Sequence, residues 1–225
     1  NQMVSAGLNN LFGEVMWFYP ELNSSVVNRM VAYNYFDSSP QRPVWTVGSL
    51  ARTMWRDSAV FGKPHALEYD ASTDTSFDVV GNTEGRTSYY EHETGTDQNR
   101  NGTITAITAN ILSGDFDITQ RIARGATTGT ADLRGDGEFL MKIRRFIPDF
   151  ISQTGDTRIT LNLRNFPNDT AASSSLGPFD ITTSTQKIDT RARARAIALK
   201  VENISTSQNW KLGTFRLDIQ PDGRR

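Results

Sequence analysis

The sequence contains no cysteine and only two histidines, His65 and His92, among its 225 residues. The absence of cysteine excludes disulfides, cysteine-ligated zinc, iron–sulfur clusters and thiol catalysis. Two histidines leave little material for His-based metal sites or catalytic triads. The sequence also has no phosphate-binding loop, dinucleotide fingerprint, nucleophile elbow or zinc-ligand spacing. We therefore expect a protein that is not an enzyme and that has no metal site and no cofactor.

Long apolar runs are missing as well. No stretch approaches the ~18 consecutive apolar residues of a membrane helix, so we expect no membrane-spanning segment. No long amphipathic helix is evident either. Hydrophobic residues make up 37% of the chain and aromatic residues 10%, which indicates a folded protein with a core.

The chain also has no large excess of positive or negative charge, because its net charge is −1. That balance is far from the strongly basic composition of a dedicated nucleic-acid binder. The charges are unevenly spread: residues 1–100 contain 7 Lys/Arg and 12 Asp/Glu, whereas residues 101–225 contain 17 and 13. The asymmetry favours head-to-tail contacts between copies or an anionic partner for the basic half. An uneven spread of solvated charges explains it equally well.

Short runs of β-branched and aromatic residues, separated by turn residues, recur along the chain and are typical of antiparallel strands. The runs at 14–19, 26–36 and 44–47 predict a meander, the unit of a propeller blade or a small sandwich sheet. A helix across 48–56 stays open as an alternative. We predict an all-β fold of antiparallel meanders, with a partial β-propeller in residues 1–103 and a second, platform-like β-rich region in 104–225.

An alternating arginine–alanine segment begins at residue 191. Read as one strand over 191–201, it places Arg191, Arg193 and Arg195 on one face together with three apolar residues, and alanines on the other. Guanidinium groups roughly 6.6–7 Å apart on one face repel each other unless they meet carboxylates, phosphates or water. The segment therefore predicts a subunit interface or a surface facing DNA phosphates, with an exposed strand end as the plain alternative.

The four tryptophans and one cluster of possible ligands complete the candidates. Trp17, Trp45, Trp55 and Trp210 are predicted to be core or interface anchors rather than ligand platforms. Glu91, His92 and Glu93 are the densest group of possible metal ligands. On a strand the two glutamates share a face and the histidine points away, so the three meet at one ion only with a bulge. The sequence leaves cation binding there undecided.

Several blocks of the sequence, in order along the chain, together resemble one known family. They are residues 17–55, 113–117 with 139–150, 177–179, and the close formed by 191–196 and 210–225. These blocks are similar to the tail nozzle proteins of short-tailed bacteriophages, also called tail tubular or packaged-DNA stabilisation proteins. Nozzle proteins are usually considerably longer, so the resemblance implies that this chain holds part of the propeller and the carboxy-terminal region.

The resemblance implies a structural virion protein without enzymatic activity. It would form a hexameric ring below the portal and adaptor, retain packaged DNA and form its ejection channel. The implied partners are further copies of the chain, portal and adaptor ring proteins, tail fibre or needle proteins, and double-stranded DNA in transit. The implied location is the phage tail, assembled in the host cytoplasm. The alternative is a carbohydrate-binding or depolymerase β-module of a tail fibre, which would use exposed aromatic platforms and a carboxylate pair.

Overall fold

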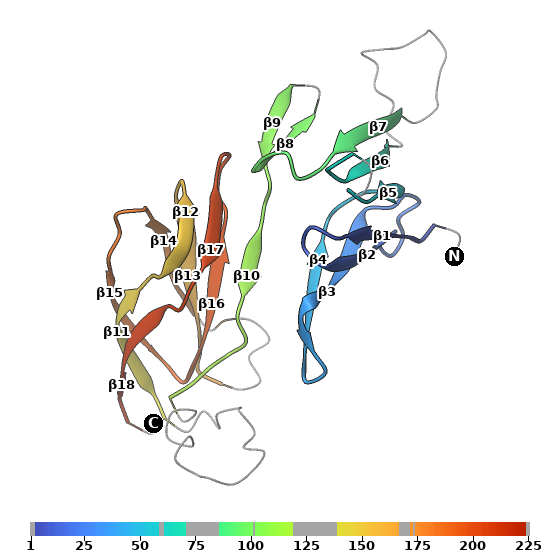
Figure 1. The fold of residues 1–225 in the computed structure, drawn as a ribbon. Helices are drawn as coiled ribbons and strands as arrows, with labels where there is room; N and C mark the ends of the chain where they lie inside the picture. The colour runs from blue at the N-terminus through green and yellow to red at the C-terminus, as the bar shows by residue number, and fades with distance from the viewer. Residues whose placement is uncertain are drawn as a thin grey trace. The chain divides into compact units, whose positions relative to one another are not determined.

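The computed structural model describes residues 3–58, 61–70, 86–100, 102–118, 139–166, 172 and 174–223. The regular elements in these ranges are strands joined in antiparallel sheets, which confirms the all-β prediction (Figure 1). The partial propeller stays a prediction. Within the same ranges, no helix has the length and apolar character needed to cross a membrane.

The chain divides into two compact units, Asn1–Thr94 and Gly95–Arg225. From the sequence we divided the chain after residue 103, whereas the structure divides it between Thr94 and Gly95. The hairpin of β8 (Asp97–Arg100) and β9 (Thr103–Ala106) therefore belongs to the second unit.

The first unit begins with a four-stranded meander. In sheet order, its strands are β1 (Ser5–Asn9), β2 (Glu14–Tyr19), β3 (Arg29–Ser39) and β4 (Arg42–Gly48). Alternation divides the sheet into two faces. Met16, Phe18 and Ala32 are buried on the inner face, whereas Trp17 lies on the opposite, outer face.

A second, three-stranded sheet packs against the inner face of this meander. It consists of β5 (Met54–Arg56), β6 (His65–Asp70) and β7 (Arg86–Glu91). The Trp55 ring stacks on Phe18 with centroids 5.8 Å apart, and its Nε1 donates to the Leu8 carbonyl at 2.7 Å. A Cβ at Gly7 would lie 2.5 Å from the Trp55 ring, so glycine is required for this approach. The helical alternative for 48–56 was wrong, because its last residues form β5.

The second unit contains two larger sheets. One has the order β10 (Asn110–Leu112), β16 (Ala196–Glu202), β13 (Thr157–Arg164) and β14 (Ser174–Ile181). The other has the order β15 (Ile188–Ala194), β11 (Met141–Ile147) and β18 (Arg216–Pro221). A two-stranded sheet pairs β12 (Phe150–Thr154) with β17 (Asn209–Leu212). The two larger sheets contribute to one core, which includes the fully buried Met141, Ile143, Phe146, Ile159 and Leu161.

The arginine–alanine segment is broken at Arg195, contrary to the single strand that the sequence predicted. β15 ends at Ala194 and β16 begins at Ala196 in the other large sheet, while the Arg195 amide donates to the Arg164 carbonyl at 3.0 Å. The prediction that the arginines share a face with Ile197, Leu199 and Val201 was therefore wrong. Ala192 and Ala194 are buried in the same core as those three residues. β15 and β16 belong to different sheets but bury side chains in the same core. The alternation of buried and exposed residues therefore shifts by one residue at Arg195, where the chain passes from one strand to the other.

Replacing Ala194 with leucine tests this corner. Ala194 is 0% exposed, so a larger side chain overpacks the core and is expected to destabilise the protein by about 1–3 kcal/mol. Denaturant unfolding measures the change. The matched variant Arg191→Leu, at an exposed position of the same strand, should stay within about 0.5 kcal/mol of the parent. Equal effects at both positions would contradict the observed facing of β15.

Candidate functional surfaces

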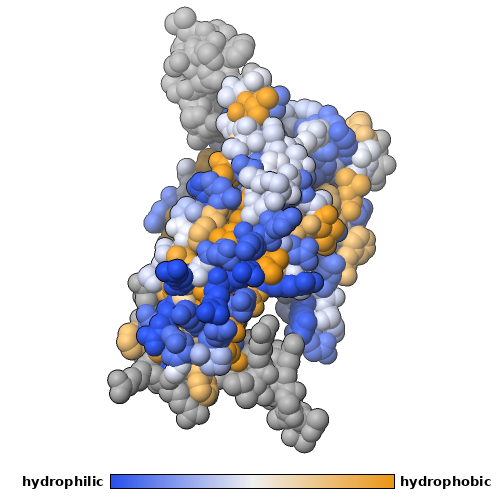
Figure 2. Space-filling view, turned by 90° about the vertical axis from the view of Figure 1, so that its left-hand side faces the viewer, coloured by the Kyte–Doolittle hydropathy of each residue, from blue (hydrophilic) through white to orange (hydrophobic). Residues whose placement is uncertain are grey.

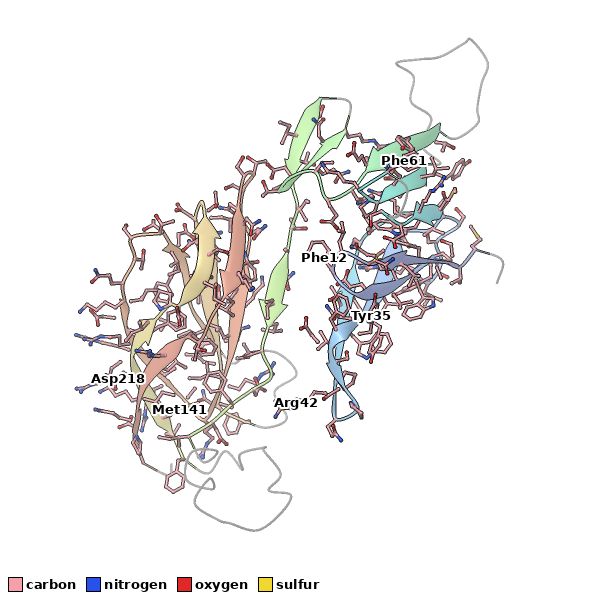
Figure 3. All side chains as sticks on the ribbon, viewed as in Figure 1. Phe12, Tyr35, Arg42, Phe61, Met141 and Asp218 are labelled. Atoms are coloured by element: carbon pink, nitrogen blue, oxygen red, sulfur yellow. The ribbon has the colours of Figure 1, made fainter. Side chains whose placement is uncertain are left out.

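Two of the three predicted arginines lie on a broad cationic surface. Arg191 and Arg193 point outward from β15, opposite the buried alanines. Exposed or partly buried cations of β11 and β18 extend the same outer side of the sheet. We call this set the basic face: Lys142, Arg144, Arg145, Arg191, Arg193 and Arg216. Figure 2, which views the molecule from this side, shows strongly hydrophilic side chains gathered there, and nitrogen-tipped side chains project from it near Asp218 in Figure 3.

Acidic neighbours neutralise only part of the basic face. Arg145 Nε lies 2.9 Å from Asp189 Oδ1, and Arg193 Nε lies 2.5 Å from Asp222 Oδ2. Hydrogen bonds from Arg145 and then Lys187 lower the pKa of Asp189, so this carboxyl stays ionised. The other four cations of the basic face make no ion pair with any residue that the structure describes. The six cations still outnumber Asp189, Asp222 and the outward-facing Asp218 of β18, and this excess of positive charge suits contact with an anionic or acidic partner.

Arg195 does not continue this row, because it sits partly buried at the corner between β15 and β16. From the sequence we did not identify the cations that β11 and β18 contribute to the basic face. In β11 the register shifts between Ile143 and Arg145, so that Arg144 is exposed and its neighbour Arg145 pairs with Asp189. A bulge interrupts simple alternation, and alternation was the signal available from the sequence.

The outer face of the β1–β4 meander is aromatic and apolar. Trp45 lies 4.8 Å from Tyr33 and 6.2 Å from Trp17 between ring centroids. Trp45 is 54% exposed and Val47 is 75% exposed. We define the aromatic face by cross-strand register as Leu8, Val15, Trp17, Val31, Tyr33, Trp45 and Val47. A contiguous exposed surface of this kind typically marks a contact with another protein.

The other two tryptophans are core anchors. Trp55 joins the two sheets of the first unit, as described above. Trp210 on β17 is partly buried, packs edge-on against Phe150 at 6.4 Å, and donates from Nε1 to Asn203 Oδ1 at 2.5 Å. The sequence could not separate these two from Trp17 and Trp45, because alternation does not reveal which face of a sheet is covered.

Glu91, His92 and Glu93 point to three different places. Glu91 lies 3.6 Å from Lys63 Nζ on the exposed side of the second sheet. His92 turns inward, where its Nε2 accepts from Arg52 Nε at 2.9 Å. Glu93 accepts from the Asn9 side-chain amide at 3.3 Å. The three side chains therefore do not share one ligand. Within the described part of the chain, no three or more His, Asp and Glu side chains gather as a metal site.

Arg52, which donates the hydrogen bond to His92, is the centre of a buried polar cluster. Arg52 is 4% exposed, and its Nη1 donates to Glu68 Oε2 and to the Ala51 carbonyl, both at 2.7 Å. Its guanidinium carbon lies 4.2 Å from the centre of the Tyr90 ring. The cluster links the segment before β5 to β6 and β7 within one unit. It is an internal clamp rather than an accessible reaction site.

His92 makes the first unit sensitive to acid. Burial, followed by the charges of Arg52 and His65, lowers the pKa of His92 from 6.5 to about 4. Between these values the unfolded chain binds a proton that the folded protein excludes. The free energy of unfolding therefore falls as the pH drops from 6.5 to about 4. Replacing His92 with glutamine, which keeps an acceptor for Arg52, should flatten this part of the stability–pH curve. A curve unchanged by the substitution would contradict the assignment.

No protein-family model matches the chain, and a search of curated proteins finds no match. The case for a function therefore rests on the surfaces just described and on the resemblance seen in the sequence.

Proposed function

We propose that this chain is a non-enzymatic structural protein of a short-tailed phage, forming part of the tail nozzle ring below the portal and adaptor. In that role it retains packaged DNA and contributes to the channel through which DNA leaves. The observation that carries the proposal is the aromatic face, on which Trp45 and Val47 are largely exposed. A sheet face of this composition suits burial against another protein surface.

The basic face supports the same role. Head-to-tail rings need two different surfaces on each copy, one for each neighbour. The aromatic face and the basic face are two such surfaces, and they belong to different units of the chain.

The four-stranded meander also suits the proposed partial propeller, because a propeller blade is a four-stranded antiparallel sheet that packs against its neighbours. In this proposal the inner face of the meander is already covered by β5–β7, and the aromatic face is the side left for a neighbouring blade or subunit.

A tail-fibre carbohydrate module is the second candidate, favoured by a separate aromatic group. On the exposed side of β6 and β7, the His65 ring stacks on Tyr89 with centroids 5.4 Å apart and meets the Phe61 edge at 4.9 Å. Tyr89 is 65% exposed and Phe61 is 56% exposed. Exposed rings of this kind can stack on sugars as well as on protein.

Light scattering and glycan binding with the purified chain separate the two candidates. The nozzle proposal predicts self-association that weakens when Trp45 is replaced with aspartate, and no retention on host polysaccharide. The carbohydrate proposal predicts saccharide binding or cleavage that is lost with Tyr89→Ala and kept with Trp45→Asp. Saccharide binding by a chain that does not self-associate would overturn the nozzle proposal.

A further inference from the structure

Three oxygen-bearing side chains meet where the β1–β2 hairpin closes. Asn9 ends β1 and Glu14 begins β2, and the two are direct cross-strand partners. Partners in register place their side chains on the same side of the sheet, which here is the inner side. Glu93 arrives from the segment after β7 and accepts a hydrogen bond from Asn9 Nδ2 at 3.3 Å. One residue from each of three segments therefore contributes to one place.

Asn9 is the buried member of this group. It is only 3% exposed, and its side-chain oxygen Oδ1 has no hydrogen-bond partner in the structure. A buried amide oxygen is normally satisfied by a protein donor, a water or a cation. Because Nδ2 already donates to Glu93, Asn9 presents its free oxygen beside a carboxylate.

The two carboxylates lack a balancing positive charge. Glu14 is partly buried. Among the residues that the structure describes, its side chain makes no ion pair or hydrogen bond, and the Glu93 carboxylate has only the bond from Asn9. Burial and then the charge of Glu93 raise the pKa of Glu14. Two cations of the same unit pair with other carboxylates, Arg52 with Glu68 and Lys63 with Glu91.

The backbone at Glu93 is also held in an uncommon conformation. Its φ is 59°, in the left-handed region that non-glycine residues seldom occupy. Such conformations persist where the surroundings determine them, often at ligand sites. Here the conformation accompanies the reversal by which Glu91 points to Lys63 and Glu93 to Asn9.

We propose that Glu14, Glu93 and the Asn9 side-chain oxygen form a Ca²⁺ site. Ca²⁺ takes 6–8 oxygen ligands in irregular geometry from carboxylates, amide oxygens, backbone carbonyls and water. Mg²⁺ demands a nearly regular octahedron, and Zn²⁺ prefers nitrogen or sulfur. His92, the residue before Glu93, offers a nitrogen ligand but faces Arg52 instead. The bound ion would tie the β1–β2 hairpin to the end of β7. This site is independent of the proposed function.

Thermal unfolding and calorimetric titration of the chelator-treated chain with CaCl₂ test the site. Saturating Ca²⁺ is expected to raise the Tm by on the order of 5 °C. Glu14→Gln and Glu93→Gln should each weaken Ca²⁺ binding at least tenfold. Glu91→Gln, two residues from Glu93 on the opposite side, should bind as the parent does. Without Ca²⁺, Glu14→Gln should be no less stable than the parent, because the substitution removes the repulsion between carboxylates.

Three outcomes would overturn the proposal. They are no Ca²⁺-dependent change in the parent, an equal shift with MgCl₂ at matched ionic strength, and an equal loss of affinity in Glu91→Gln. A parent that binds no Ca²⁺ but loses stability as the pH rises through the raised pKa of Glu14 would mean that a shared proton, rather than a metal ion, balances the pair.

Discussion

Replacing Glu68 with leucine is expected to destabilise the first unit by about 3–5 kcal/mol, because the substitution leaves the buried Arg52 guanidinium without its carboxylate. The side chains of this pair are only 5% and 14% exposed, so water cannot compensate the lost partner. The arginine also donates to His92 and lies over Tyr90, so a displaced Arg52 disturbs β7 and the residue after it as well as β6. Denaturant unfolding followed by tryptophan fluorescence measures the effect, since Trp55 lies in this unit beside His92.

Two control variants separate the buried charge from side-chain loss in general. Glu91→Leu breaks the exposed pair with Lys63 and should cost far less, because exposed pairs contribute about 0–1 kcal/mol. Combining Glu68→Leu with Arg52→Met removes both charges and should recover much of the lost stability. If the double variant is no better than Glu68→Leu alone, the stranded charge is not the cause.

If the chain forms the proposed ring, replacing Arg191 and Arg193 together with glutamate is expected to prevent its assembly. Both side chains lie on the basic face, and the double change reverses its charge along β15. Copies that associate through this surface would then meet like charges, which opposes association. Native mass spectrometry and size-exclusion chromatography with light scattering measure the assembled fraction. Arg195→Glu is tested separately, because its position at the strand corner links it to folding as well.

The matched control is the pair Arg42→Glu and Lys211→Glu, which changes the net charge equally at exposed positions outside the basic face. This control should assemble as the parent does. If rings of the Arg191/Arg193 variant form normally and only DNA retention changes, the basic face lines the channel instead. If neither property changes, the arginines are a solvated strand surface and the interface interpretation is wrong.

The strand positions were predictable where alternation is local and uninterrupted. The run 14–19 coincides with β2, and the alternating apolar residues Ile159, Leu161 and Leu163 are buried in β13. Prediction failed at Arg195, where the chain changes sheets. The bulge at Arg144 likewise changes the phase of β11 without any signal in the alternation. The change of sheet and the bulge both depend on how the two sheets pack around their common core. A pattern within one strand does not contain that information.

The candidate surfaces were only partly predictable for the same reason. Trp17 and Trp45 were named from the sequence, but their exposure depends on which face β5–β7 covers. The basic face joins three strands that are distant in the sequence. Glu93 was noted beside His92, yet the partner that distinguishes it is Asn9, 84 residues earlier. Periodicity identifies the residues on a face, whereas only the fold identifies their neighbours.

Electron microscopy of the purified chain mixed with portal and adaptor rings tests the central claim most directly. We predict six-fold rings docked on the adaptor, with the aromatic face buried against a neighbouring subunit or blade. Particles that stay monomeric or trimeric in the presence of these rings, with Trp45 facing solvent, would contradict it.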